Sequence, residues 1–188
     1  MAKLEYLDPA PFEKMAPAII ENIREIDPQT IANICSAYSK SYVRHEPLFE
    51  QLGKMSLRLM QKFKIKELSM VLSSYARLGL KNDQLLQLAA EEIIYRGTIG
   101  RRHRYDRPTY FRFHLVSLEQ IIGAFSKLKY TDKRVYFVMY KMLRPELRRS
   151  NLKPGLDADI TARIMTSYAS ADVRLSGFVK FIGEHVSK

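Results

Sequence analysis

The residues best suited to binding chemistry lie in one stretch, 96–114, which reads RGTIGRRHRYDRPTYFRFH. It holds six arginines and one aspartate, interleaved with four tyrosines or phenylalanines. Arginine binds phosphate through paired hydrogen bonds and stacks on nucleobases, and aromatic rings offer further stacking surfaces. We expect an RNA contact made by Arg96, Arg101, Arg102, Arg104, Tyr105, Arg107, Tyr110, Phe111 and Arg112. The alternative is a loop that docks on an acidic protein face, or one whose rings pack back on the fold while its arginines stay solvated.

A second basic stretch, 141–153, carries five lysines or arginines and one glutamate. We expect it to extend the basic surface, although a solvated helix end would explain it equally well. Its candidate RNA contacts are Arg144, Arg148, Arg149 and Lys153.

A repeated helix must position these stretches. Residues 31–40 (IANICSAYSK), 68–77 (LSMVLSSYAR) and 118–127 (LEQIIGAFSK) read alike, and 161–170 (TARIMTSYAS) is a weaker copy. Apolar residues recur at i, i+3, i+4 and i+7, which is typical of the buried stripe of an amphipathic helix. We name it helix A and align its copies on Tyr38, Tyr75, Phe125 and Tyr168.

A second amphipathic helix, helix B, follows each copy. Its apolar residues stand ten, eleven and fourteen positions after the aromatic residue: Leu48, Phe49, Leu52; Leu85, Leu86, Ala89; Val135, Tyr136, Met139; and Phe178, Val179, Ile182. The period from Tyr38 to Tyr75 is 37 residues, and subtracting it brings Phe12, Met15 and Ile20 into register. The chain is therefore predicted to begin with a lone helix B.

Helical hairpins bury their apolar faces by stacking on neighbours, so we expect an all-α, right-handed α-solenoid: a lone helix B and four A–B hairpins, nine helices in all. The alternative is a non-repetitive helical bundle. The spacings from Tyr75 to Phe125 and from Phe125 to Tyr168 are 50 and 43 residues, which places insertions between a helix B and the next helix A. The single solenoid, 1–188, is divided into a half repeat 8–27, repeats at about 28–64, 65–96, 115–143 and 157–188, and basic insertions 96–114 and 141–153.

The side of helix A away from the core forms a predicted groove. Positions five and two before the aromatic residue and two after it share that side: Asn33, Ser36, Lys40; Met70, Ser73, Arg77; Gln120, Gly123, Lys127; and Arg163, Thr166, Ser170. Lys40, Arg77 and Lys127 would form a regular row of cations for the phosphates of a single strand. Alternatively, the small residues only permit close helix packing, and the cations stabilise helix C-termini.

Composition narrows the remaining functions. The 188 residues carry a net charge of +11, which favours an anionic partner, and no apolar run is long enough to span a membrane. The single cysteine, Cys35, falls in a core position of helix A, and the four histidines lack ligand spacing. With no phosphate-binding loop either, we expect no enzyme, cofactor, metal or small-molecule substrate.

The repeat resembles the heptatricopeptide family, whose unit is also 37 residues long. The shared features are a helix of small residues ending in Ala-Tyr/Phe-Ser-Lys, a Leu-Gly-Leu type turn, and a Leu-Leu or Leu-Phe pair that opens the second helix. Octotricopeptide, FAST-kinase-like and pentatricopeptide repeats are similar in style. Members are mostly mitochondrial or plastid proteins that bind, process or stabilise RNA or belong to organellar ribosomes. Many carry a RAP domain, which we do not expect here.

The resemblance implies a non-catalytic RNA-binding protein of a mitochondrion, in contact with rRNA or another structured RNA and with other subunits of a ribosome or ribonucleoprotein. The alternative is a protein–protein scaffold or accessory subunit of another mitochondrial complex. Residues 1–12 contain two acids, two prolines and no arginine, unlike a transit peptide, so the location rests on the resemblance alone.

Overall fold

The computed structural model describes residues 8–102, 114–149 and 156–173, with side chains described at 8–98, 114–146 and 159–173. Within these ranges the chain is all α-helical, with one short 3-10 turn and no strand. The elements, in order, are α1 (Ala10–Glu21), α2 (Pro28–Lys40), α3 (Glu46–Arg58), η1 (Met60–Lys62), α4 (Ile65–Leu78), α5 (Asp83–Arg102), α6 (Leu115–Lys127), α7 (Lys133–Arg149) and α8 (Leu156–Ser170).

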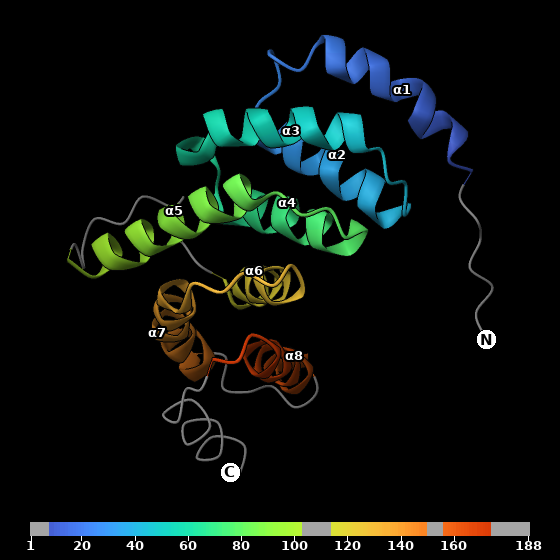
Figure 1. Ribbon diagram of the computed structural model, residues 1–188. Coiled ribbons are helices and arrows are strands. Elements are labelled where there is room, and N and C mark those ends of the chain that lie inside the picture. The colour runs from blue at the N-terminus through green and yellow to red at the C-terminus, as the bar shows by residue number, and fades with distance from the viewer. Residues whose placement is uncertain (1–7, 103–113, 150–155, 174–188) are drawn as a thin grey trace, which may run out of the picture.

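The helices pack in two rows (Figure 1). The A row consists of α2, α4, α6 and α8, each of which contacts the next. The B row consists of α1, α3, α5 and α7, with contacts from α1 to α3, from α3 to α5 and from α5 to α7. These rows correspond to the predicted helices A and B. The ninth expected helix, with Phe178, Val179 and Ile182, lies outside the described residues.

Every helix of the A row ends in the same turn. The fourth residue after the aromatic anchor has a positive φ: Tyr42 (55°), Gly79 (67°), Lys129 (59°) and Asp172 (51°). The amide of the following residue donates back to the carbonyl of the anchor at 2.9, 2.9, 2.9 and 3.1 Å. This is the Schellman ending, which satisfies carbonyls that a helix terminus leaves without partners. Only Gly79 adopts the left-handed conformation without steric cost.

Helix B then begins at a fixed distance from that turn. In each copy a polar side chain accepts a backbone N–H of the first turn: Asp8 from Ala10 (3.0 Å), His45 from Leu48 (3.1 Å), Asn82 from Leu85 (3.0 Å) and Asp132 from Arg134 (2.9 Å). Such capping supplies partners for amides that have none within the helix. The first three caps are 37 residues apart, so the turn and the cap keep the period that the sequence predicts.

Aromatic side chains of the A row connect each hairpin to the preceding helix B. Tyr38 donates its hydroxyl to the carbonyl of Phe12, Tyr75 to that of Phe49, and Tyr168 to that of Tyr136. The rings also meet edge to face, for example Phe12 with Tyr38 at 5.0 Å between centroids. Such aromatic pairs are worth roughly 0.5–1.5 kcal/mol beyond their burial. At the third hairpin the anchor is Phe125, which has no hydroxyl to donate.

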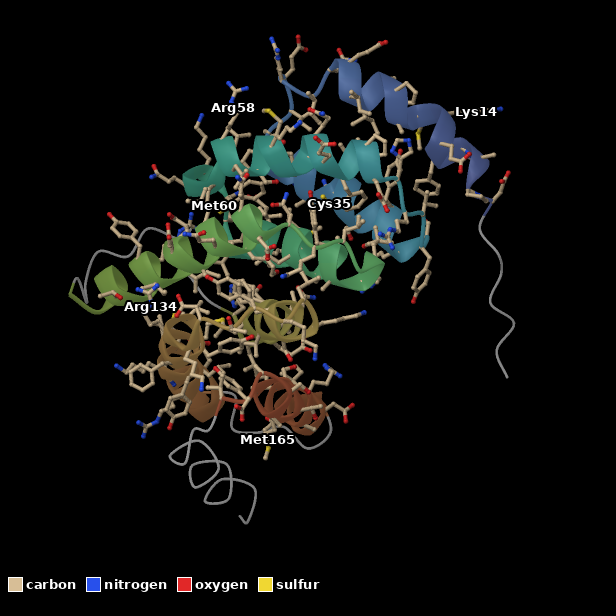
Figure 2. The ribbon with its side chains drawn as sticks, viewed as in Figure 1. Lys14, Cys35, Arg58, Met60, Arg134 and Met165 are labelled. Atoms are coloured by element: carbon tan, nitrogen blue, oxygen red, sulfur yellow. The ribbon has the colours of Figure 1, made fainter. Side chains whose placement is uncertain are left out.

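The predicted core stripes are confirmed in the first three A helices and in α3, α5 and α7. Leu118, Ile121, Ile122 and Phe125 are all fully buried, and Cys35 is buried as expected (Figure 2). Met15 is an exception, because 48% of it is exposed despite its register with Leu52 and Ala89. The reason is that α1 is the first described helix of the B row, so it has a neighbour in that row, α3, on one side only.

Helix continues into both basic stretches, because α5 runs through Arg102 and α7 through Arg149. For the stretch 141–153, this agrees with the alternative of a helix end. Packing between these two helices explains the extension. A Cβ on Gly97 would lie 2.5 Å from Cγ1 of Val138 and 3.1 Å from the sulfur of Met142, and Leu143 is fully buried.

The left-handed residues provide a first prediction. Lys129→Gly should raise the free energy of unfolding by roughly 0.5–1 kcal/mol, because a left-handed side-chain-bearing residue is strained. Gly79→Lys should lower it by about 1 kcal/mol, since nothing crowds a Cβ there and only the backbone conformation opposes the change. Urea denaturation measures both, and a loss of stability in Lys129→Gly would contradict the shared turn.

The buried tyrosine hydroxyls provide a second prediction, which concerns the pH dependence of stability. Burial raises the pKa of Tyr75, Tyr136 and Tyr168 well above the usual value of 10. Because the folded state then holds these protons more tightly than the unfolded chain, their contribution to stability is complete below about pH 10 and falls as the pH rises further. Urea midpoints and phenolate absorbance should change together above that pH, and gradual ionisation of every tyrosine in the folded protein would contradict the burial.

Candidate nucleic-acid interface

The three predicted cations of helix A occupy equivalent places in the structure. Lys40, Arg77 and Lys127 are exposed residues in the last turns of α2, α4 and α6. They lie two residues past the buried anchor, about 200° around the helix from it, which directs them away from the core. Because these helices pack in sequence, the cations form one row along the edge where the A helices end. We call this row the cation row.

Charge at this edge is only partly neutralised. The turns that follow contain local ion pairs: Arg44 with Glu46, Lys81 with Asp83, and Arg134 with Asp132, each at 2.8 Å. The Asp132 pKa is lowered, chiefly by the hydrogen bond from the Arg134 side chain. No ion pair is found for the cation row among the described side chains. Its charges face solvent while their neighbours in the turns are paired.

The row is not continued to α8. Ser170 stands at the equivalent position there, and Asp172 takes the left-handed place in the following turn. At that same turn position the third hairpin has Lys129, which adds a second cation beside Lys127. Sequence analysis missed Lys129, although its spacing of four from Phe125 matches that of Gly79 from Tyr75. The positive edge therefore extends over three hairpins.

Several side chains of the predicted polar groove are engaged by bonds to a neighbouring helix or within their own helix. Gln120 accepts a hydrogen bond from Ser69 (3.0 Å), and Arg163 pairs with Glu119 (3.0 Å). Ser73 and Thr166 donate within their own helices, to Met70 (3.1 Å) and Ala162 (2.9 Å). Beside the groove, buried Ser39 and Ser74 bond between α2 and α4 (3.0 Å). These contacts favour the packing interpretation of the small residues over base recognition.

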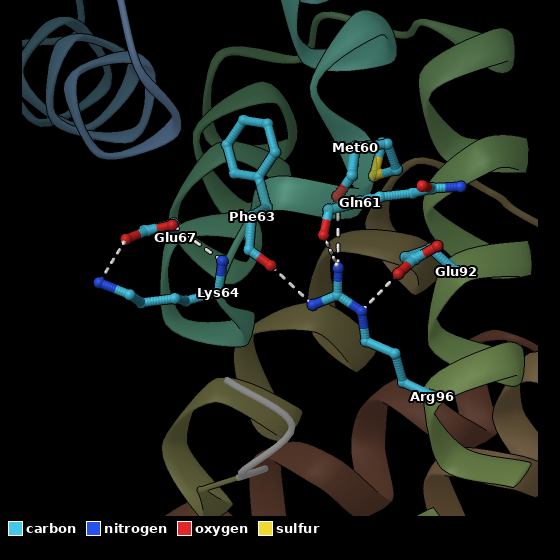
Figure 3. Close-up of polar contacts among 7 residues, drawn as sticks. All are labelled: Met60, Gln61, Phe63, Lys64, Glu67, Glu92 and Arg96. Atoms are coloured by element: carbon cyan, nitrogen blue, oxygen red, sulfur yellow. Dashed lines mark hydrogen bonds and ion pairs between the residues drawn. The ribbon is translucent and has the colours of Figure 1, made fainter. Parts of the chain in front are cut away.

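Arg96, predicted to bind RNA, is buried, with 1% of its surface exposed. Its guanidinium donates to the carbonyls of Phe63 (2.6 Å), Met60 (3.3 Å) and Gln61 (3.2 Å), and pairs with Glu92 at 2.5 Å (Figure 3). It therefore holds the turn between α3 and α4 against α5. The prediction for this residue is wrong, because its donors are directed into the protein and a phosphate has no access to them.

The other predicted contacts divide by position. Arg101 and Arg102 lie in the last turn of α5, and Arg148 and Arg149 in the last turn of α7. Arg144 is exposed on α7, with its guanidinium carbon 5.9 Å from the centroid of the Tyr140 ring. The remaining candidates lie outside the described residues: Arg104, Tyr105, Arg107, Tyr110, Phe111, Arg112 and Lys153.

The described parts of the chain offer little support for a nucleophilic cysteine, a metal site or a membrane span. Burial raises the pKa of the Cys35 thiol, which disfavours a thiolate nucleophile. His45 caps α3 through Nδ1. Within the described ranges there is no cluster of three or more His, Cys, Asp or Glu side chains arranged to hold a metal ion. A search of the same residues for a helix with the length and apolar character of a membrane span also finds none.

Comparison with known proteins returns no match to any protein-family model. The curated proteins likewise contain no sequence that matches this one.

The opposite environments of Arg96 and Arg77 provide a third prediction. Arg96→Met should lower the free energy of unfolding by about 3 kcal/mol, because it leaves Glu92 and three carbonyls without their buried donor. Arg77→Met is the matched control and should cost less than about 1 kcal/mol, since Arg77 is exposed at a helix end. Urea denaturation of both variants makes the comparison, and equal losses would contradict the two assignments.

Proposed function

We propose that the chain is a right-handed α-solenoid that binds single-stranded RNA without catalysis, through the cation row at the C-terminal ends of its A helices. The observation that carries this proposal is the equivalence of Lys40, Arg77 and Lys127. Each is exposed in the last turn of its helix, and each stands two residues after a buried aromatic anchor. A row of cations at regular intervals is complementary to a phosphate backbone, whose charges are also regular.

The recurrence of one hairpin unit supports the solenoid. Four A helices end in the same turn, and each contacts its predecessor in the A row. Adjacent packed helices are about 8–10 Å apart, so the cation row repeats at about that interval. Lysine and arginine side chains are long enough to adjust to phosphates across such a spacing, which suits a flexible single strand.

The favourable effect of the cations on helix C-termini is compatible with RNA binding, because a cation stabilises the helix end through its charge while it faces solvent. A scaffold that binds acidic proteins would use the same charges. A polyanion is the better candidate, because the edge carries a single exposed aromatic residue, Tyr42, whereas a protein interface centres on several apolar side chains.

The small number of phosphate contacts in the cation row suggests that the protein binds RNA as part of a larger assembly. Three hairpins with cations offer only a few phosphate contacts, and few contacts give weak binding at physiological salt. We therefore place the protein in a larger ribonucleoprotein with rRNA or another structured RNA, where other subunits add affinity. A mitochondrial ribosome is our proposal for that assembly, and it rests on the heptatricopeptide resemblance. The part of the basic insertion 96–114 that lies outside the described residues stays a predicted RNA contact.

A fourth prediction tests the cation row. Changing Lys40, Arg77 and Lys127 together to glutamine should weaken binding of a single-stranded RNA. The slope of log K against log salt concentration should become shallower by up to about 2, at roughly 0.7 per lost phosphate contact. Fluorescence anisotropy of a labelled oligonucleotide over a salt series measures both quantities.

The matched control changes Lys14, Lys54 and Arg58 to glutamine, which removes the same charge from exposed positions on α1 and α3. Its slope should stay close to that of the wild type. Equal effects of the two triple variants would show that only total charge matters and would contradict the proposal. Binding of an acidic peptide by the wild type, without binding of RNA, would favour the scaffold.

A further inference from the structure

The outer side of α7 differs from that of the other B helices at equivalent positions. One exposed position follows the core residue in register with Phe49 in each of the four described B helices, and its occupants are Glu13, Glu50, Gln87 and Phe137. The position four residues later holds Pro17, Lys54, Glu91 and Lys141. Three of the four helices thus contain an acidic residue in this pair of positions, whereas α7 has an aromatic residue and a cation.

The interactions within these pairs differ accordingly. In α3, Lys54 forms an ion pair with Glu50 at 2.7 Å, and in α5, Gln87 donates to Glu91 at 3.2 Å. In α7, the Lys141 ammonium lies 3.9 Å from the centroid of the Phe137 ring. A lysine over an aromatic ring is held by the ring quadrupole with no anion to offset its charge, whereas a lysine paired with glutamate is part of a neutral pair. The pair on α7 therefore remains positive.

A third difference occurs three residues after Lys141. The equivalent positions in α1, α3 and α5 are the partly buried apolar residues Ile20, Leu57 and Ile94, which pack against the core. In α7 this position is Arg144, which is exposed. One turn before Phe137, Arg134 is also exposed and pairs with Asp132. Figure 2 shows Arg134 at the outer side, where α5 and α7 meet.

These residues make a continuous stripe. Arg134, Phe137, Lys141 and Arg144 are spaced by three, four and three residues, so they follow one side of the helix over about 15 Å. Phe137 keeps 46% of its surface exposed although Lys141 lies over it. The exposed ring and the Lys141 ammonium combine a stacking surface with a phosphate-binding group, while Arg134 at the start of the stripe is paired with Asp132.

We propose that this outer stripe binds an unpaired nucleotide, with the base stacked on Phe137 and the flanking phosphates held by Lys141 and Arg144. It is a second contact for the RNA of the proposed function, on which it rests, and it lies on the B row instead of the A row. An unpaired base is required because a base within a duplex has no free face for an aromatic ring.

The composition of the stripe favours RNA over a protein partner. A protein interface centres on several buried apolar side chains, and the stripe contains one aromatic residue among three cations. Arginine and lysine together suit phosphate, through paired hydrogen bonds from the first and a compact charge from the second. The positions on the neighbouring α5 offer no such combination, since Gln87 and Glu91 are bonded to each other.

Because the chain contains no tryptophan, one introduced tryptophan reports on its own site. The experiment compares full-length Phe137→Trp with Gln87→Trp, the equivalent exposed position on α5. Each is titrated with a single-stranded uridine oligomer of about a dozen nucleotides. We expect emission from position 137 to be quenched over the concentration range in which anisotropy reports binding, and emission from position 87 to change little. Phe137→Ala should weaken binding by about tenfold.

The outcomes separate the two proposals. If RNA binds but quenching at position 137 is absent, or equal to that at position 87, the outer stripe is overturned while the function stands. If RNA does not bind at low salt, the proposed function falls. If a glutamate-rich peptide quenches position 137 and RNA does not, the stripe is a protein contact. Lys141→Gln, compared with Lys54→Gln at the equivalent position of α3, should give the larger loss of affinity, and equal losses would remove the role of the lysine.

Discussion

The packing of one aromatic side chain against the preceding helix B is the interaction on which the structure depends. In three of the four hairpins a buried tyrosine donates its hydroxyl to a backbone carbonyl of that helix. In all four, the carbonyl of the anchor residue also receives the amide that closes the turn. One residue thus ends its own helix, aligns the next and joins its hairpin to the one before. The third anchor, Phe125, contributes the turn and the packing but not the hydroxyl.

The positions that we propose bind RNA follow from this anchor. The cation two residues after it must face solvent because the anchor faces the core, and the cap seven residues after it places helix B in register. Proteins built from stacked hairpins can therefore vary their surface without altering the stack. The B row illustrates this. Equivalent positions contain an ion pair in α3, a hydrogen bond from glutamine to glutamate in α5, and a lysine over a phenylalanine ring in α7.

The sequence predicts the features that recur in every hairpin. It does not predict contacts that a residue makes in one hairpin only. Apolar spacing correctly predicts the helices of the described residues and most of their core, and the 37-residue period correctly identifies the first helix as a helix B. It could not reveal that Arg96 is buried, because the carbonyls of Met60, Gln61 and Phe63 become its partners only when α5 packs on the preceding turn. The same limitation applies to Gly97, where the close approach of α5 to Val138 and Met142 of α7 leaves no room for a Cβ. Phe137 could have been found by comparing equivalent repeat positions, where it is the only aromatic residue among four.

The central claim is that ordered cations at the helix ends bind a phosphate backbone. Its most direct test is the affinity of the unmodified full-length chain for a single-stranded RNA, measured from low to physiological salt. Three phosphate contacts in the cation row require a slope of log K against log salt concentration of about −2 or steeper, at roughly 0.7 per contact. Binding with such a slope is the predicted result. An affinity independent of salt, or no binding at low salt, would contradict the account.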